Sequence, residues 1–258
     1  MNNIKNIVIT GASSGIGRYT AITLSKYSDY SLILTGRNKS ELELTSKMCL
    51  NPDNVTTVVM DLNQLFETEN QNRWIELMSS KQNLFALIHN AAIYETASVY
   101  LNDLVKQKKL WDKTFQTNLL TPVMLTELLW PYLQKSSKSS VINISSTLGL
   151  KPVANTAAYS ALKAALNNWT QTLAIEGAPY NIRANVICPG IVDTPIHPFH
   201  FKPEEEKSKI KKSLAELQLL NRIGEPTDIA QMIEFLISDK AEWITGSTFT
   251  VDGGIQIK

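Results

Sequence analysis

The sequence predicts an α/β protein, a parallel sheet of about seven strands with helices packed on both faces. Two observations lead to this fold class. Short apolar runs rich in β-branched residues alternate with longer amphipathic segments, which is typical of parallel strands joined by crossover helices. No internal repeat, low-complexity tract or long linker interrupts this alternation. We therefore expect a single domain over residues 1–258, a length that such folds commonly reach.

The individual elements follow from the periodicity. The apolar runs predict strands at 4–10, 31–35, 55–60, 84–90, 140–145, 182–188 and 247–251. The amphipathic segments predict helices at 16–28, 39–49, 63–80, 111–135, 157–177 and 227–238. Residues 190–225 break the regularity, because a proline-rich loop is followed there by a charged stretch, and we expect them to form a lid or substrate loop. Ligands should bind beyond the carboxyl ends of the strands.

Composition excludes several classes of protein. The formal net charge is +1, so no global field favours nucleic acid or an anionic membrane as a partner. No apolar stretch is long enough to span a bilayer, and the first ten residues lack the pattern of a secretory signal. Cys49 and Cys188 share no motif with histidine, so neither a metal site nor a disulfide is predicted. We expect a cytoplasmic protein that acts on a small molecule.

A glycine-rich turn, TGASSGIG at residues 10–17, directly follows the first predicted strand. Glycine allows the backbone to turn tightly and to approach a pyrophosphate, and the next helix offers free amide donors at its N-terminus. Ordinary strand-to-helix turns also contain glycines, but the α/β context favours a Rossmann-type dinucleotide site. The predicted contacts are Gly11, Ser13, Ser14, Gly15, Ile16 and Gly17.

The end of the second strand indicates which dinucleotide binds. A carboxylate that accepts the ribose hydroxyls of NAD(H) is missing there, and Arg37 stands in its place. An arginine pairs well with a phosphate, so NADP(H) is preferred and NAD(H) is the second choice. Asp61 ends the third strand beside Leu62, and it is placed either to accept a hydrogen bond from the adenine amino group or to cap the next helix.

Four polar residues are candidates for the chemistry. Tyr159 and Lys163 are four positions apart, so they share one face of a predicted helix, although such pairs also arise by chance. A neighbouring ammonium would lower the pKa of the tyrosine and make it a proton donor or acceptor near neutral pH. Ser146 ends a strand and could hold a substrate oxygen. Asn118 lies in a predicted helix, where an asparagine is unfavourable, and it could bind a relay water or simply face solvent.

Taken together, these motifs resemble the short-chain dehydrogenases/reductases. TGASSGIG, Asp61, the NAA of residues 90–92, Asn118, Ser146, YSALK, PGIVDTP and VDGG stand in the family's order over almost the whole chain. The resemblance implies hydride transfer between a nicotinamide and a carbonyl or alcohol carbon, with Tyr159 exchanging the hydroxyl proton. It also implies that Ser146 orients the substrate, Lys163 binds the ribose and tunes Tyr159, and Asn118 supports a water chain.

The same resemblance assigns further cofactor contacts and an assembly. Asn90 and Ala91 match the segment that lines the adenosine ribose, and the loop over the nicotinamide is matched by Pro189, Gly190, Val192 and Thr194. Ala92 departs from the family's usual glycine, and Ser14 departs from the basic residue of many NADP-preferring members. The family implies a homotetramer.

The substrate is bounded by the loop after Thr194 and by residues 93–109. His197, Phe199, His200 and Phe201 make that loop aromatic, which favours an apolar carbonyl compound, and we assign the histidines no catalytic role. A general carbonyl reductase or alcohol dehydrogenase is the preferred interpretation. The alternatives are a 3-oxoacyl-[acyl-carrier-protein] reductase, with Lys135 and Lys138 binding the acidic carrier, and a non-catalytic dinucleotide sensor.

Overall fold

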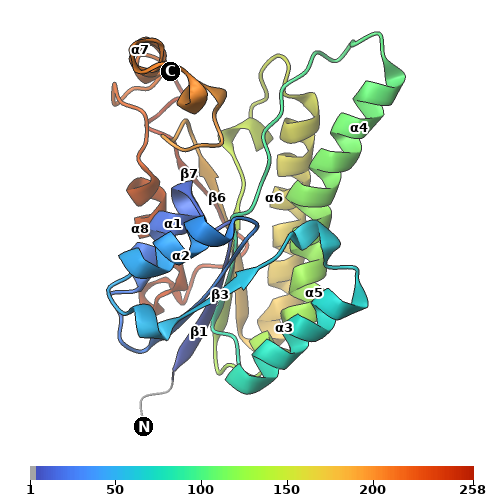
Figure 1. Ribbon diagram of the computed structural model, residues 1–258, viewed down its shortest axis with the longest axis vertical. Helices are drawn as coiled ribbons and strands as arrows, with labels where there is room; N and C mark the ends of the chain where they lie inside the picture. Colours follow the sequence, from blue (N-terminus) through green and yellow to red (C-terminus); the bar gives the residue numbers. More distant parts are fainter. Residues whose placement is uncertain (1–3) are drawn as a thin grey trace.

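A seven-stranded parallel sheet forms the centre of the protein, as the sequence predicts (Figure 1). The computed structural model describes residues 4–258, so residues 1–3 of the predicted domain lie outside it. The strands are β1 (Lys5–Thr10), β2 (Tyr30–Gly36), β3 (Val55–Val59), β4 (Ala86–His89), β5 (Ser139–Ile144), β6 (Ile182–Pro189) and β7 (Thr248–Val251). Each predicted strand is therefore confirmed to within two residues at either end.

The order of the strands creates a crevice in the middle of the sheet. Their order is β3-β2-β1-β4-β5-β6-β7, so the chain builds outward in one direction from β1 and then in the other direction from β4. The chain segments that leave the carboxyl ends of β1 and β4 therefore turn away from each other, towards opposite faces of the sheet. In open parallel sheets this switch point is where ligands bind.

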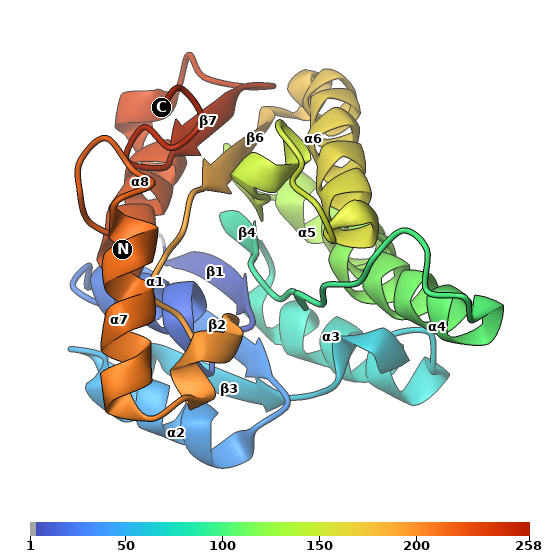
Figure 2. The same cartoon turned by 90° about the horizontal axis from the view of Figure 1, so that it is seen from above.

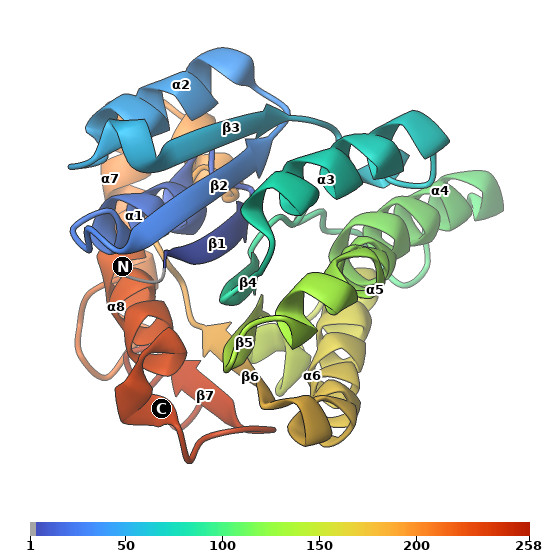
Figure 3. The ribbon, with the colours of Figure 1, turned by 90° about the horizontal axis from the view of Figure 1, so that it is seen from below.

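Helices cover both faces of the sheet. They are α1 (Gly15–Leu24), α2 (Lys39–Met48), α3 (Thr68–Lys81), α4 (Leu104–Phe115), α5 (Thr121–Gln134), α6 (Ala157–Gly177), α7 (Glu204–Ala215) and α8 (Pro226–Ile237). Seen from below, α1, α2 and α8 lie on one face, and α3, α5 and α6 lie on the other (Figure 3). The helix α7 lies above the carboxyl ends of the strands, where the lid was expected (Figure 1).

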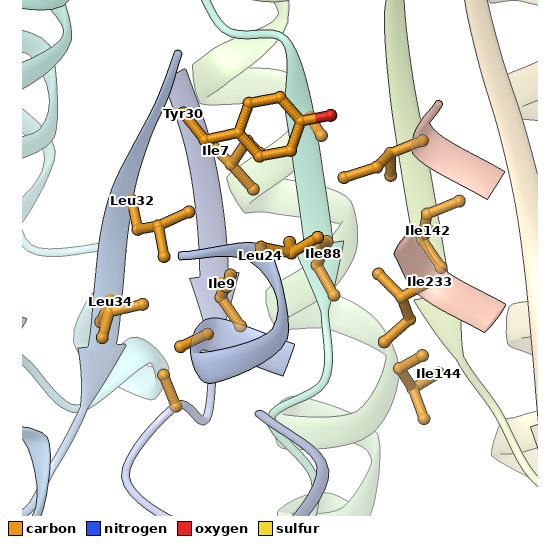
Figure 4. Packing of buried hydrophobic residues seen from close by; sticks show 14 of the residues in the cluster. Ile7, Ile9, Leu24, Tyr30, Leu32, Leu34, Ile88, Ile142, Ile144 and Ile233 are labelled. Carbon is orange, nitrogen blue, oxygen red and sulfur yellow. The ribbon is translucent and has the colours of Figure 1, made fainter. Parts of the chain in front are cut away.

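Two apolar layers hold these helices to the sheet. On the face of α1 and α8, the inward side chains of alternate strand positions, such as Ile7 and Ile9, pack with Leu24 and Ile233 from the helices (Figure 4). The opposite face packs Trp74 of α3 and Leu129 of α5 against Val8 of the central strand. Both sides of β1 are thus buried, which explains why its sequence is continuously apolar. In the described part of the chain, no helix has the length and apolar character needed to cross a membrane.

The predicted helix 111–135 is wrong in two respects. Helix α4 begins seven residues earlier, at Leu104, where the side chain of Asp103 caps it by accepting from the Lys106 amide. A π-helical turn, Gln116–Leu120, then separates α4 from α5. The turn widens the backbone around Asn118, whose side chain bonds a neighbouring loop instead of facing solvent. Periodicity alone does not reveal an inserted residue of this kind.

Two other helix boundaries also differ from the prediction. Helix α1 ends at Leu24 instead of residue 28, because the chain must turn there to bring Tyr30 beside Lys5 in the sheet. Helix α3 begins at Thr68 instead of residue 63, since Leu62–Gln64 form a separate 3-10 turn capped by Asp61.

Candidate active site

A cavity of about 620 Å³ opens at the carboxyl ends of the strands, over the switch point between β1 and β4. In the view from above, α7 lies on one side of the strand ends and α6 on the other (Figure 2). Leu214 of α7 and Tyr159 of α6 both line the cavity. All but two of the predicted site residues line it. The exceptions are Gly17 and Asn118, which lie behind the cavity wall.

The glycine-rich turn forms one wall of the cavity. Gly11 and Gly15 have φ angles of 65° and 51°, in the region that favours glycine. A Cβ atom on Gly17 would lie 2.4 Å from the carbonyl oxygen of Gly11, so α1 can pack against the turn only with glycine there. Ser14, at the N-cap of α1, makes no side-chain capping bond to the described residues. The first amides of α1 thus remain free donors, which is what a pyrophosphate requires.

The segment after β4 holds this turn in place. The side-chain amide of Asn90 donates to the carbonyl oxygens of Thr10 and Gly11 at 3.0 and 3.1 Å. The hydroxyl of Thr10 accepts from the backbone amides of Asn90 and Ala91 at 2.9 and 3.0 Å. These four bonds tie the ends of β1 and β4 together, so Asn90 shapes the glycine-rich turn through its side chain as well as its backbone.

Arg37, Asp61 and Leu62 line the end of the cavity that is predicted to hold the adenosine. Arg37 is exposed, and its guanidinium makes no hydrogen bond or ion pair with any residue in the range 4–258. The preceding residue is Gly36, and a Cβ atom there would lie only 3.2 Å from the hydroxyl oxygen of Ser13. Glycine therefore keeps this part of the cavity open. Asp61 caps the following turn by accepting from the Asn63 amide at 3.0 Å. One carboxylate oxygen of Asp61 is used in this bond and the other is not, so the two expected tasks of Asp61 are compatible.

Tyr159, Lys163 and Ser146 meet at the other end of the cavity. Tyr159 and Lys163 come from the first two turns of α6, and Ser146 follows β5. The Lys163 ammonium nitrogen lies 5.6 Å from the centroid of the Tyr159 ring and donates to the carbonyl oxygen of Ile144 at 2.7 Å. The Ser146 hydroxyl accepts from the Leu148 amide at 3.1 Å, which fixes its oxygen beside the tyrosine. The three side chains are 2 to 9% exposed.

The electrostatics of this group differ from the prediction. Burial raises the pKa of Tyr159, and the hydroxyl of Ser146 acts in the opposite direction. Burial also lowers the pKa of Lys163 to about 8. The predicted lowering of the Tyr159 pKa by Lys163 is therefore wrong. The reason is burial, which is the largest influence on the phenol, while the Lys163 ammonium bonds to the carbonyl oxygen of Ile144.

Asn118 fixes the start of the segment 93–109, which is predicted to bound the substrate. Its side-chain oxygen accepts from the amide of Ile93, and its side-chain nitrogen donates to the carbonyl of Ile93, both at 2.9 Å. The residue is 1% exposed, so the alternative of a solvent-facing asparagine is wrong. One N–H and one lone pair of the amide remain for water.

The loop from Pro189 to Thr194 covers the middle of the cavity. A Cβ atom on Gly190 would lie 2.8 Å from the Cα of Asp252, so the loop and the chain after β7 are in close contact. Asp193 joins this loop to the lid, because it pairs with His200 at 2.6 Å and also with Lys211 of α7. The predicted lid thus consists of a 3-10 turn, Pro198–Phe201, and α7, both anchored on Asp193.

Several cavity residues lie outside the sequence prediction. Tyr94 packs its ring edge against Tyr159 with 4.9 Å between centroids. The sequence predicts this residue only as part of the segment 93–109 that bounds the substrate. No motif marks three further apolar residues of the cavity, Leu148, Val153 and Ile255. Leu214 and Leu217 also line the cavity, and they lie inside the predicted lid, residues 190–225.

Comparisons with known proteins agree with this geometry. Residues 11–256 match the family model described as "Enoyl-(Acyl carrier protein) reductase". "Dehydrogenase/reductase SDR family member 4" of Pongo abelii is 34% identical over 169 residues, which are 65% of this chain and 58% of that protein. The aligned part thus spans little more than half the length of this relative.

Two further comparisons cover nearly the whole chain. "3-oxoacyl-[acyl-carrier-protein] reductase FabG" of Thermotoga maritima is 30% identical over 257 residues, 98% of each chain. The solved structure of a 4-hydroxyisoleucine dehydrogenase complexed with NADH is 32% identical with a TM-score of 0.82, covering 98% of this chain and 99% of that one. With a family model over almost its full length and the motif residues gathered at one cavity, the chain belongs to the short-chain dehydrogenase/reductase family.

Proposed function

We propose that the protein is an NADP(H)-dependent carbonyl reductase or alcohol dehydrogenase acting on a ketone or secondary alcohol. The observation that carries this proposal is the burial of Tyr159, Lys163 and Ser146 side by side in the cavity that the glycine-rich turn opens into. A bound nicotinamide would supply or accept the hydride. In the reductive direction, the Tyr159 hydroxyl gives its proton to the substrate oxygen while the Ser146 hydroxyl holds that oxygen.

The two basic groups support this assignment in different ways. A charged Lys163 favours the phenolate that Tyr159 becomes once its proton has left, and Lys163 also binds the cofactor ribose. Arg37 carries the preference for NADP(H), since its free guanidinium at the cavity rim suits a 2'-phosphate. The likeness to the 4-hydroxyisoleucine dehydrogenase complexed with NADH makes NAD(H) the competing cofactor.

The test is the reduction of a panel of ketones, diketones and acetoacetyl thioesters, measured as the loss of NADPH absorbance. Tyr159→Phe should lower kcat by roughly 100-fold or more, because it removes the proton donor and leaves binding in place. Arg37→Asp should shift the ratio of kcat/KM for NADPH to that for NADH by roughly tenfold or more. Turnover that survives Tyr159→Phe would refute the mechanism, and an unchanged cofactor ratio would refute the role of Arg37.

A 3-oxoacyl-[acyl-carrier-protein] reductase is the second candidate, favoured by the full-length likeness to the Thermotoga maritima protein. The lysines expected to bind the acidic carrier argue against it. Lys138 precedes β5, at the end of the sheet opposite the cavity, and it pairs there with Asp239 and Glu242 at 2.7 and 2.6 Å. Lys135 lies at the end of α5 and its ammonium lies over the Tyr132 ring. Faster turnover of the acetoacetyl thioester than of every simple ketone would favour this candidate instead.

A sensor without activity is disfavoured, because Ser146, Tyr159 and Lys163 are all present in the cavity. We also propose a homotetramer in the cytoplasm. Exposed aromatic side chains support the assembly, since Trp243 is 100% exposed and Phe115 of α4 is 43% exposed. The two free, buried cysteines are in keeping with a reducing compartment. Light scattering of the purified protein tests the assembly. A measured mass equal to that of one chain would contradict the tetramer.

A further inference from the structure

His197 lies in a row of aromatic rings that leads to the catalytic centre. Its ring stacks on Phe199 with 5.3 Å between centroids and an interplanar angle of 7°. On the other side it meets the ring of Tyr94 at 6.0 Å, and Tyr94 in turn meets Tyr159 at 4.9 Å. His197 also lines the cavity. Only the ring of Tyr94 therefore separates the imidazole from the residue that exchanges the proton.

The segment carrying His197 is held from both sides. Phe199, on which the imidazole stacks, is 7% exposed. His200 pairs with Asp193 at 2.6 Å, and Lys211 of α7 pairs with the same carboxylate. The backbone amide of His197 also donates to the carbonyl of Thr194 at 3.2 Å. The imidazole is therefore fixed in position relative to the cofactor loop.

The protonation state of this imidazole and its unpaired nitrogens determine which hydrogen bonds it can make with a ligand in the cavity. Burial and the nearby His200 lower the pKa of His197, so the ring is neutral at physiological pH. A neutral imidazole has one N–H donor and one acceptor nitrogen. No hydrogen bond joins either ring nitrogen to another residue in the range 4–258. The acceptor nitrogen therefore keeps its lone pair for a ligand in the cavity that His197 lines.

We propose that His197 is a specificity-determining residue whose acceptor nitrogen binds a hydroxyl or N–H group of the substrate. The preferred substrates are then carbonyl compounds that carry a hydrogen-bond donor within a few atoms of the carbonyl, with apolar groups elsewhere. The inference rests on the proposed function and narrows its substrate class. The donor requirement is assigned to His197, and the apolar groups are matched by aromatic or aliphatic residues of the cavity such as Phe199 and Leu217.

The physical reason for selectivity is the cost of leaving an acceptor without a partner. A substrate with a methoxy group in place of the hydroxyl has nearly the same shape but cannot donate, so it displaces water from His197 without replacing the hydrogen bond. The net value of one such bond corresponds to roughly a tenfold change in affinity. Phenylalanine at position 197 would keep the stacking on Phe199 and remove the acceptor.

The experiment measures binding of alcohols to the complete protein saturated with NADPH, since an alcohol cannot react with the reduced cofactor. The ligand pairs are cyclohexane-1,2-diol against 2-methoxycyclohexanol, and the corresponding 1,3 pair, titrated by calorimetry. For at least one pair, the wild type should bind the diol roughly tenfold more tightly. His197→Phe should bind both members equally, and His197→Gln, which restores an acceptor oxygen, should recover part of the preference.

Equal affinities within both pairs for the wild type would overturn the inference, and so would a preference that persists in His197→Phe. Reduction of cyclohexanone by the same samples tests the proposed function separately. If the diol preference depends on His197 but no ketone is reduced, the proposed function fails and the binding site stands. If ketones are reduced without any diol preference, only this inference fails.

Discussion

Acid should destabilise this protein through one buried histidine, His89, at the end of β4. The side chain is 3% exposed and its ring packs edge-on against Trp169. Its Nε2 lies 2.8 Å from the hydroxyl of Thr126, and that hydroxyl already donates to the carbonyl of Pro122, so the imidazole must be the donor. Burial lowers the pKa of His89 from 6.5 to about 3. The native state therefore holds this residue neutral over most of the acidic range.

The sign and size of the effect follow from linkage. Below pH 6.5 the unfolded chain takes up a proton at His89 that the native protein cannot take up until about pH 3. The contribution of His89 to stability is thus complete above pH 6.5 and is lost as the pH falls towards 3. The full difference corresponds to about 5 kcal/mol as an upper limit, at about 1.4 kcal/mol for each pH unit. At about pH 5 the loss is about 2 kcal/mol.

The perturbation is His89→Asn, which keeps a polar side chain but cannot be protonated. Urea unfolding at about pH 7.5 and about pH 5 gives the free energy of unfolding of both proteins. Other groups also titrate in this range, so the relevant quantity is the difference between the two proteins in their loss of stability. The wild type should lose about 2 kcal/mol more than the variant. Equal losses would refute the reasoning, whatever the variant's stability at neutral pH.

Two other predictions concern the cavity. Gly17→Ala should abolish cofactor binding, measured by fluorescence titration with NADPH, because a Cβ atom would lie 2.4 Å from the Gly11 carbonyl oxygen and force the turn open. Unchanged binding would show that the turn is more adaptable than its packing indicates. Asp193→Asn should raise KM by roughly fivefold with little change in kcat, since it weakens partly exposed ion pairs between the cofactor loop and the lid without touching Tyr159. A fall in kcat with constant KM would instead assign Asp193 to the chemical step.

Much of the fold could be predicted from the sequence, because buried parallel strands are short, apolar and separated by helices. Helix α6 has the predicted bounds, and all seven strands are confirmed. The errors lie where a side chain or a turn overrides periodicity. Asn118 bonds the backbone of Ile93 and lies in a π-helical turn, and Asp61 caps a 3-10 turn ahead of α3. Both are tertiary or capping effects that a window of sequence does not contain.

The candidate site could be predicted where glycine geometry or helical spacing constrains it. Gly11 needs a positive φ, and Tyr159 and Lys163 must share a helix face, so their sequence positions are informative. Part of the apolar wall could not be predicted, since Leu148 and Ile255 come from distant segments and resemble core residues in the sequence. The direction of the Tyr159 pKa shift also could not be predicted, because it depends on how deeply the folded chain buries the phenol.

The paired hydrogen bonds between Asn118 and Ile93 change how kinetic data on this residue should be interpreted. The Asn118 side chain bonds both the amide and the carbonyl of Ile93, as a neighbouring β-strand would. The next residue along the loop is Tyr94, which packs on Tyr159. Replacing Asn118 therefore releases a wall of the substrate pocket as well as removing a possible water ligand. A loss of activity in Asn118→Ala is then no measure of proton relay by itself. The solvent isotope effect and the substrate KM must be followed together to separate the two contributions.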